Sequence, residues 1–215
     1  MSHVSDKIHE YFSTFPKRSY DKGQILIFAN QEPDYILYVT EGKVRQYDVS
    51  YRGDEIAVNI YKPPAFFPMA AVLTHTPNRY LFRTESKTTV HAIPPKQALA
   101  FLEANPDVTL DLLRRLYMGV DGLLGRMVQL MAGTAKSRLM YELLVECRRF
   151  GKQGAANSYT LTISEVDIAA RSGLTRETVS REMGKIKSEG LVSLGHQGIH
   201  VPDITKLEQK LGLDT

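Results

Sequence analysis

Two short helical segments separated by a glycine, near the C-terminus, restrict the possible folds more than any other part of the chain. The first is expected over residues 165–172, because Ser164 with Asp167 three positions later has the spacing of a helix N-cap. Gly173 follows and allows a tight, left-handed turn. Small or apolar side chains are expected on the inward face of this first helix: Val166, Ile168 and Ala169. A small side chain there lets a second helix cross closely, as in a helix-turn-helix.

The second helix of this pair is expected to begin after Thr175, a suitable N-cap residue. Apolar side chains at steps of four and three form its inner face: Val179, Met183 and Ile186. Polar and charged side chains are grouped on the opposite side: Arg176, Glu177, Ser180 and Arg181. A β-hairpin is expected next, with strands at residues 191–194 and 199–201 around the turn Gly195-His196-Gln197-Gly198. These elements in this order predict a winged helix-turn-helix.

The charged face of the second helix has the chemistry needed to bind DNA in the major groove, which admits one α-helix. Arg176 and Arg181 can each offer two N–H donors to O6 and N7 of a guanine, and Glu177 can accept from N4 of a cytosine. A carboxylate facing a polyanion is unfavourable, so its place beside two arginines favours base recognition over general attraction to phosphate. Thr175, Ser180 and the helix N-terminus suit phosphate contacts. The alternative is an ordinary surface helix with solubilising charges.

Charge and composition permit a polyanionic partner without requiring one. The chain of 215 residues carries a formal net charge of +3, and residues 171–187 hold five basic and two acidic side chains. Cys147 is the single cysteine, which excludes an internal disulfide and a cysteine-ligated iron–sulfur cluster or zinc site, and we expect it to be a buried core thiol. Because no apolar run approaches 18 residues, we expect a cytoplasmic protein without a membrane partner.

Motifs for catalysis are missing from the sequence. Neither a serine nor Cys147 lies in a recognisable nucleophile motif, and no glycine-rich phosphate loop is present. No set of His, Cys and Asp residues has the spacing of metal ligands. The sequence therefore predicts a binding protein rather than an enzyme, with no catalytic and no metal-binding residues.

The N-terminal part of the chain, from Arg18 to about Pro94, has the pattern of many short β-strands. Its segments are rich in Ile, Val, Tyr and Thr: QILIF, YILYVTEG, KVRQYDV, EIAVNIY and TTVHAI. Turn signals separate them: Asp21-Lys22-Gly23, Glu41-Gly42, Arg52-Gly53-Asp54 and Pro63-Pro64. This alternation predicts an antiparallel barrel or sandwich.

A long helix is predicted from Pro106 to about Met131. Apolar residues at steps of three and four form a heptad seam along it: Leu113, Leu116, Val120, Leu123, Met127 and Leu130. A second apolar stripe recurs every seven residues beside the seam: Leu110, Tyr117, Leu124 and Met131. We expect one stripe to pack on the chain's own barrel and the other on a second copy; the alternative is one wide face inside a single subunit. Three helical glycines, Gly119, Gly122 and Gly125, indicate either close packing or a deformable helix.

A domain boundary is expected near Gly133, where the long helix stops. Another amphipathic helix is predicted over residues 135–150, and GKQGAANS, residues 151–158, is expected to be a loop. A short strand is expected at residues 161–163. The predicted domains are a β-roll at residues 1–104, a helix and hinge at residues 105–133, and a DNA-binding domain at residues 134–215.

The chain as a whole, over about residues 18–203, resembles the transcription regulators of the cyclic-AMP receptor protein/FNR (Crp/Fnr) family. The most specific part is SGLTRETVSREMGKIKSEGLV, while YDKGQILIFANQEPDYILYVTEGKVRQY is similar to the opening strands of the family's sensor domain. The resemblance implies an α+β protein with a jelly-roll, a dimerisation helix and a winged helix-turn-helix. It also implies a homodimer on a palindromic operator with half-sites about 34 Å apart, RNA polymerase as a candidate partner, and Arg176, Glu177 and Arg181 at the principal base-contacting positions.

The resemblance does not extend to the cyclic AMP pocket. Members that bind cyclic AMP carry a Gly-Glu pair for the ribose, an Arg-Ser pair for the phosphate and two hydroxyls on the long helix. This chain departs from all three: Pro68 and Met69 replace Gly-Glu, Tyr80 replaces the serine after Arg79, and Leu123 and Leu124 replace the hydroxyls. An unpaired ribose hydroxyl and an apolar wall at the phosphate would each cost about 1–3 kcal/mol. The sequence argues against cyclic AMP, and its single cysteine excludes FNR-type iron–sulfur sensing.

Several interpretations of this pocket stay open. A small effector, apolar or anionic, is a candidate, because the pocket would be lined by apolar residues with Arg79 as an anchor: Phe66, Phe67, Met69, Leu123 and Leu124, with Tyr80 beside them. Haem is a less favoured candidate, with His75 and Met69 as ligand types. A filled cavity without any effector is the third interpretation, in which Arg79 pairs with an acid such as Glu85. For the whole chain, the alternative to a DNA-binding regulator is an effector-binding module whose output is protein–protein contact.

Overall fold

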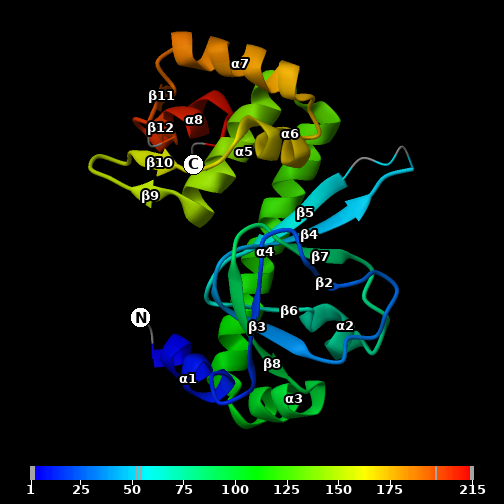
Figure 1. The fold of residues 1–215 in the computed structure, drawn as a ribbon. Coiled ribbons are helices and arrows are strands. Elements are labelled where there is room, and N and C mark those ends of the chain that lie inside the picture. Colours follow the sequence, from blue (N-terminus) through cyan, green and yellow to red (C-terminus); the bar gives the residue numbers. More distant parts are fainter. Residues whose placement is uncertain (1–2, 52, 54, 197, 214–215) are drawn as a thin grey trace. The chain divides into compact units, whose positions relative to one another are not determined.

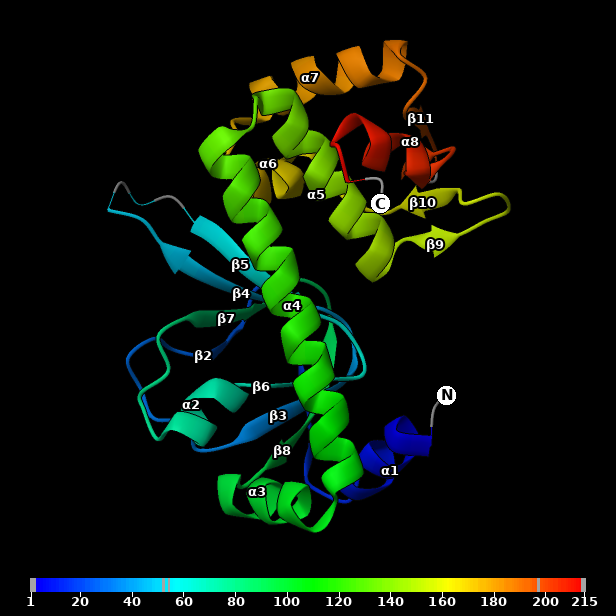
Figure 2. The ribbon, with the colours of Figure 1, turned by 180° about the vertical axis from the view of Figure 1, so that it is seen from behind.

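The computed structural model describes residues 3–51, 53, 55–196 and 198–213. The chain, drawn as a ribbon in Figure 1, divides into two compact units, Met1–Leu116 and Tyr117–Thr215. Each unit has its own buried core. The division falls inside α4, the long helix Pro106–Ala132, which runs without interruption (Figure 2). Its C-terminal half therefore belongs to the same unit as the helices that follow it.

The first unit contains two four-stranded antiparallel sheets, with strand orders β1-β8-β3-β6 and β2-β7-β4-β5. The strands are β1 (Lys17–Tyr20), β2 (Ile25–Ile27), β3 (Ile36–Glu41), β4 (Val44–Val49), β5 (Glu55–Tyr61), β6 (Ala65–Phe67), β7 (Leu81–Thr84) and β8 (Thr88–Ile93). The five predicted strand segments correspond to β2, β3, β4, β5 and β8, and the predicted antiparallel β-roll is confirmed. Of the predicted turn at residues 52–54, Arg52 and Asp54 lie outside the described residues.

The β-roll core lies between these two sheets. Leu37 and Val39 of β3 and Phe82 of β7 are buried in this one core. Phe67 of β6 stacks on Phe82 with ring centroids 4.7 Å apart, and the Tyr61 ring lies against both, 4.8 Å from Phe67 and 5.9 Å from Phe82. These rings contribute a large share of the buried apolar surface of this core, because each aromatic side chain buries a large area.

Three helices of the first unit are absent from the sequence predictions: α1 (His3–Phe12), α2 (Met69–Thr74) and α3 (Pro95–Ala104). α1 and α3 pack together through a second core, in which Tyr11 stacks on Phe101 at 4.2 Å and Phe12 lies 5.3 Å from the same ring. Each of these helices spans ten residues or fewer, too short to show more than two or three repeats of the helical apolar period.

The start of α4 packs on this second core by a face that the heptad analysis did not identify. Val108 is the single buried residue of α4 among those described, and Leu112 packs beside it. The expectation that one of the two apolar stripes packs on the barrel is not met by the stripe residues of this first unit. Leu110 of the second stripe and Leu113 of the seam are both about half exposed. Val108 and Leu112 turn a different side of the helix toward the core.

The second unit combines the end of α4 with four helices and one sheet. The helices are α5 (Ala135–Phe150), α6 (Glu165–Ser172), α7 (Arg176–Ser188) and α8 (Ile204–Lys210), and the sheet has the order β11-β12-β10-β9. The strands are β9 (Lys152–Gln153), β10 (Tyr159–Leu161), β11 (Ser193–Gly195) and β12 (Gly198–Val201). α5 has the predicted bounds, and its N-cap Thr134 accepts a hydrogen bond from the Ser137 amide.

Two local predictions for this unit need correction. The strand expected at residues 161–163 is β10, Tyr159–Leu161, because the antiparallel register pairs Tyr159 with Val201 and Leu161 with Ile199. The segment GKQGAANS is not a simple loop, because β9 within it pairs with β10. A two-residue strand has no periodicity of its own, and its partner strand alone defines it.

Candidate nucleic-acid interface

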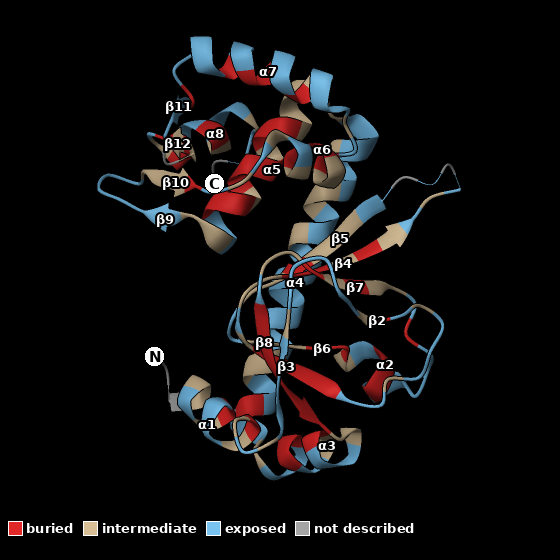
Figure 3. Cartoon of the chain, in the orientation of Figure 1, coloured by how far each residue is buried: buried red, intermediate tan, exposed pale blue. Residues whose placement is uncertain are grey.

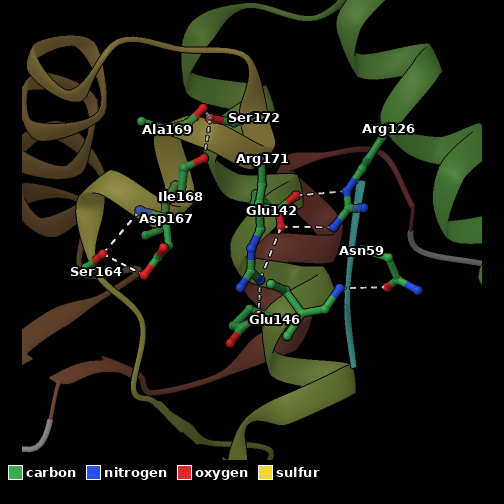
Figure 4. A network of polar contacts seen from close by, with 11 residues as sticks. Asn59, Arg126, Glu142, Glu146, Ser164, Asp167, Ile168, Ala169, Arg171 and Ser172 are labelled. Carbon is green, nitrogen blue, oxygen red and sulfur yellow. Dashed lines mark hydrogen bonds and ion pairs between the residues drawn. The ribbon is translucent and has the colours of Figure 1, made fainter. Parts of the chain in front are cut away.

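The turn between α6 and α7 has the local geometry that the sequence predicted. Ser164 Oγ accepts from the Asp167 amide at 3.1 Å and donates to Asp167 Oδ2 at 2.7 Å, so the N-terminus of α6 is capped (Figure 4). Gly173 ends α6 with φ of 65°, in the left-handed region. Thr175 then caps α7 by accepting from the Thr178 amide at 3.2 Å. These bonds fix the direction in which α7 leaves the turn.

The inner faces of α6 and α7 belong to one core, which also includes apolar residues of α5. Ile168 and Ala169 of α6 are buried there, as predicted, and the apolar inner residues of α7 are also buried: Val179, Met183 and Ile186. Val166 is not buried, contrary to expectation: 57% of its surface is exposed. The buried face of α6 continues instead to Ser172, whose hydroxyl donates to the Ile168 carbonyl at 2.7 Å.

The predicted DNA-contacting residues all lie exposed on one end of α7 and its cap. They are Thr175, Arg176, Glu177, Ser180 and Arg181. Figure 3 shows exposed residues along α7 interleaved with the buried residues that anchor it. The helix N-terminus adds the positive end of its dipole and free N–H groups to this face. The face therefore combines hydrogen-bond donors, positive charge and one carboxylate, all of them exposed.

Glu177 is ionised on this face at neutral pH. The backbone N–H of Glu177 itself, the Thr175 hydroxyl and the nearby charge of Arg176 hold the pKa of the Glu177 carboxyl below its usual range. An ionised carboxylate can only accept hydrogen bonds. It can therefore accept from an amino group on a base edge, and it repels a phosphate placed at the same point.

Sequence reasoning missed Glu182, which organises two cations on α7. Its carboxylate accepts from Lys185 Nζ at 2.8 Å and from Arg181 Nε at 3.4 Å, and Lys185 holds its pKa below the usual range. Glu182 itself is buried, like its neighbour Met183. The available signal was the spacing of three between Glu182 and Lys185, which brings opposite charges together on a helix.

The wing follows α7 as the hairpin of β11 and β12, in which Ser193 pairs with His200 and Gly195 with Gly198. Gly198 has φ of 113°, and a Cβ there would stand 2.1 Å from the Leu161 carbonyl oxygen, so glycine is required at this point. Gln197, in the predicted turn, lies outside the described residues. An open hollow of about 300 Å³ lies on the outer side of this sheet, lined mainly by Thr160, Ser193, His196 and His200.

The residues assigned to an effector pocket occupy several different environments. Phe67 is fully buried in the β-roll core, and Tyr80 packs against that core. Met69 packs on the second core with α1 and α3. Arg79 is exposed, with its guanidinium 5.7 Å from the Tyr80 ring. Leu123 and Leu124, both about half exposed, lie on α4 in the second unit.

The remaining candidates for this pocket are also placed. Phe66 packs on the second core. His75 is exposed and forms the C-cap of α2. Glu85, considered as a partner for Arg79, instead forms an ion pair with Arg45.

The residues of the heptad seam of α4 are all substantially exposed. Its six residues, Leu113, Leu116, Val120, Leu123, Met127 and Leu130, each expose between 39% and 61% of their surface. Several more apolar residues of α4 are exposed: Leu110, Tyr117, Met118, Leu124, Val128 and Met131. Apolar exposure along a helix for several turns marks an interaction surface rather than scattered surface residues.

Within the described ranges, no three His, Cys, Asp or Glu side chains are grouped closely enough to hold a metal ion. Among the same residues, no helix combines the length and the apolar character needed to cross a membrane. The exposed face of α7 is therefore the main candidate site among the described residues.

Comparison with known families places these two units in a defined class. The model of the cyclic nucleotide-binding domain matches residues 17–105, and that of the Crp-like helix-turn-helix domain matches residues 137–210. The chain is thus a helix-turn-helix regulator with a cyclic nucleotide-binding-type β-roll.

Curated relatives with the same arrangement are transcription regulators. The global nitrogen regulator of Nostoc sp. (strain PCC 7120) is 26% identical over 85% of this chain and 83% of its own length. The fumarate and nitrate reduction regulatory protein of Escherichia coli (strain K12) is 24% identical over 91% of this chain and 78% of its own length. The chain belongs to the Crp/Fnr family of transcription regulators, which the sequence resemblance predicted.

Solved structures share the fold. A CooA mutant from Carboxydothermus hydrogenoformans has a TM-score of 0.78 at 23% identity, covering 94% of this chain and 90% of the other. FixK2 from Bradyrhizobium japonicum has a TM-score of 0.69 at 24% identity, covering 93% and 97%. At this level of identity the likeness supports the β-roll, long helix and winged helix-turn-helix, and it says nothing of effectors.

Proposed function

We propose that this chain is a homodimeric regulator that binds a palindromic DNA operator in a sequence-specific manner, with α7 in the major groove. The observation that carries this proposal is the exposed end of α7, where Arg176, Glu177 and Arg181 stand clear of the core while Val179 and Met183 anchor the opposite side. Two guanidinium forks can recognise guanines and the carboxylate can recognise a cytosine. Thr175 and Ser180 would bind the flanking phosphates.

The exposed seam of α4 supports the homodimer. A row of six half-exposed aliphatic residues at heptad spacing suits a parallel partner with the same row, since symmetric dimers use one surface twice. In such a dimer the two α7 helices would lie in successive major grooves, about 34 Å apart. In this proposal, residues 1–104 form the β-roll, residues 105–133 form the dimerisation helix and hinge, and residues 134–215 bind DNA.

We also propose that cyclic AMP is not the signal. Met69 lacks a carboxylate for a ribose hydroxyl, Tyr80 replaces a serine, and Phe67 and Phe82 stack on each other inside the roll. The candidate pocket residues lie in separate environments and Arg79 is exposed, which favours regulation without an effector over regulation by a small apolar or anionic effector, or by haem. RNA polymerase remains a proposed partner for activation, because Crp/Fnr regulators act on transcription.

Selection of binding sites from random duplex DNA, followed by gel shifts, tests the main proposal. Wild-type protein should enrich a two-fold symmetric site, and its affinity should fall steeply with salt, because lysines and arginines displace condensed counterions. Arg181→Ala should relax base preference at one position of each half-site, at a cost of about 1–3 kcal/mol. Arg148→Ala, which removes an exposed arginine of α5 in the same unit, is the matched control and should retain the full preference. Enrichment of no sequence would favour the alternative, a module whose output is protein–protein contact.

A further inference from the structure

Two buried glutamates on α5 form the centre of an ion-pair network in the second unit. Glu142 is 1% exposed and Glu146 is 3% exposed. A buried carboxylate is strongly unfavourable unless it is paired and hydrogen-bonded, so its partners are essential to the local structure. Those partners come from the helices on either side of α5 (Figure 4).

Arg126 of α4 is the first partner. Its Nε donates to Glu142 Oε2 at 2.9 Å, and its Nη2 donates to Glu142 Oε1, also at 2.9 Å. The Arg126 side chain is largely buried in this contact. Two parallel bonds between a planar guanidinium and a planar carboxylate define an orientation as well as a distance. The pair therefore fixes the rotation of α4 about its axis relative to α5.

Arg171 of α6 is the second partner. Its Nη1 donates to Glu146 Oε2 at 2.6 Å and lies 3.8 Å from Glu142 Oε1. Because α6 is the first helix of the helix-turn-helix, the network joins α4, α5 and α6 in one continuous series of charges. α7 is connected to α6 by the short turn at Gly173 and shares its core.

Further contacts close the corner between α4 and α5. Arg138 of α5 donates from Nε to the Gln129 carbonyl at 3.2 Å and from Nη2 to the Leu130 carbonyl at 2.7 Å. These carbonyls are in the last turn of α4, and the Gln129 carbonyl also accepts from the Gly133 amide at 2.9 Å. The corner at Gly133 is thus held from both sides, by Arg138 at the end of α4 and by Arg126 two turns earlier.

None of these hydrogen bonds and ion pairs uses a seam side chain of α4; Arg138 meets the seam residue Leu130 only at its main-chain carbonyl. Val120, Leu123 and Met127 remain about half exposed while Arg126 is buried against α5. One side of the helix can therefore meet a partner copy while another side is fixed to the DNA-binding domain.

We propose that Arg126 is a positioning residue for DNA recognition. Through its fork with Glu142, it sets the orientation of α7 relative to the seam and so sets the distance between the two recognition helices of the dimer. This inference rests on the proposed function, namely a dimer on a palindromic site. Under this inference, the contact between α4 and α5 determines which spacing of half-sites the dimer binds.

Operator spacing provides the test. Starting from the selected palindromic site, one base pair is inserted or removed between the half-sites, and a single half-site is prepared as well. Wild-type protein should prefer the original spacing by roughly tenfold, the size of effect that one mismatched base pair produces. Arg126→Gln should lower affinity for the original spacing and flatten the preference among the three spacings. Its affinity for the single half-site should stay unchanged, because α7 itself is intact.

Two variants separate positioning from simple folding effects. Arg148→Gln removes another ion pair of α5, the more exposed contact of Arg148 with Glu208 at 2.9 Å, which joins α5 to α8 and not to α4, and it should keep the wild-type spacing preference. Arg126→Lys keeps the charge and loses the fork, so it should fold and show an intermediate preference.

The possible outcomes distinguish this inference from the proposed function. Spacing preference retained in both Arg126 variants overturns the positioning role while leaving the proposed function standing. Equal loss at the full site and the half-site, with a lowered melting temperature, assigns Arg126 a structural role and also overturns it. Wild-type protein without any preferred sequence overturns the proposed function itself, before a variant is compared.

Discussion

Gly125 of α4 lies directly against the hydroxyl of Tyr141 of α5. A Cβ at residue 125 would stand 1.7 Å from Tyr141 Oη and 2.5 Å from Cζ, and the same hydroxyl lies 3.4 Å from the Gly122 carbonyl oxygen, to which it donates. Of the two explanations for glycines in this helix, close packing holds at Gly125. A Cβ at Gly119 or Gly122 would meet no described atom within 4 Å.

The first prediction follows from this difference between neighbouring glycines. Gly125→Ala should destabilise the protein by about 1–2 kcal/mol, because overpacking against Tyr141 exceeds the gain in helix propensity. Gly122→Ala should instead stabilise it by up to about 1 kcal/mol. Urea unfolding of the two variants measures both effects, and equal shifts in the same direction would contradict the packing explanation.

A second prediction concerns the turn of the helix-turn-helix. Gly173→Ala places a side chain at φ of 65° and should cost about 1–2 kcal/mol of unfolding free energy. Gly184→Ala, in the interior of α7 with no described atom within 4 Å of the new Cβ, is the matched control and should be neutral or stabilising. Thermal unfolding distinguishes the two, and a stable Gly173 variant would count against a strict turn requirement.

A third prediction tests the seam. Val120→Glu should convert the dimer to a monomer, because two buried carboxylates would face each other across the two-fold axis. Met118→Glu places the same charge on the same helix at a residue that is 74% exposed and outside the seam, so it should remain dimeric. Light scattering after size-exclusion chromatography gives the mass of each. A monomeric wild-type protein would refute the proposed dimer.

A fourth prediction concerns acid pH. Glu189 at the end of α7 pairs with Lys136 and, at 3.8 Å, with Lys210, and these cations lower the pKa of its carboxyl. A depressed folded-state pKa adds stability above the unfolded value of about 4.3, and this stability is lost as pH falls through the folded value. Wild-type protein should therefore melt higher than Glu189→Gln at pH 7, and the difference should shrink once pH falls below the unfolded value of about 4.3 and vanish below the lowered folded-state value. A difference that stays constant with pH would exclude the ion pair as its source.

A fifth prediction concerns Cys147. Burial in the core of the second unit raises the pKa of its thiol to about 12, so at pH 8 the reactive thiolate is almost absent. Iodoacetamide should leave the native protein unmodified and should modify it fully in denaturant. Mass spectrometry measures both products. Rapid modification of the native protein would show that this core opens readily.

The winged helix-turn-helix could be predicted almost residue by residue because its signals are local. A cap such as Thr175, a glycine such as Gly173 and an apolar series such as Val179 and Met183 act within one or two helical turns. Val166 was misplaced, because an eight-residue helix offers too few apolar positions to define the buried face without its neighbours.

The β-roll was predicted as a class, while its details depended on packing. The short strands β1, β6 and β7 have weak patterns and are defined by their partners, as in the pairing of Leu37 with Phe67. The helices α1 and α3 are stabilised by stacking of Tyr11 on Phe101, residues that are 90 positions apart in the chain. No local pattern reports such a contact.

By itself the sequence determined the succession of β-roll, long helix and winged helix-turn-helix, the polar face of α7, and the heptad seam of α4. Only the tertiary structure decided that Val108 rather than either stripe meets the core, and that Arg126 meets Glu142. Periodicity and capping are encoded between near neighbours, where the geometry of one helix or strand relates sequence spacing to space. The partner of a buried charge is selected by desolvation once the whole unit is packed, and this selection depends on residues far apart in the chain.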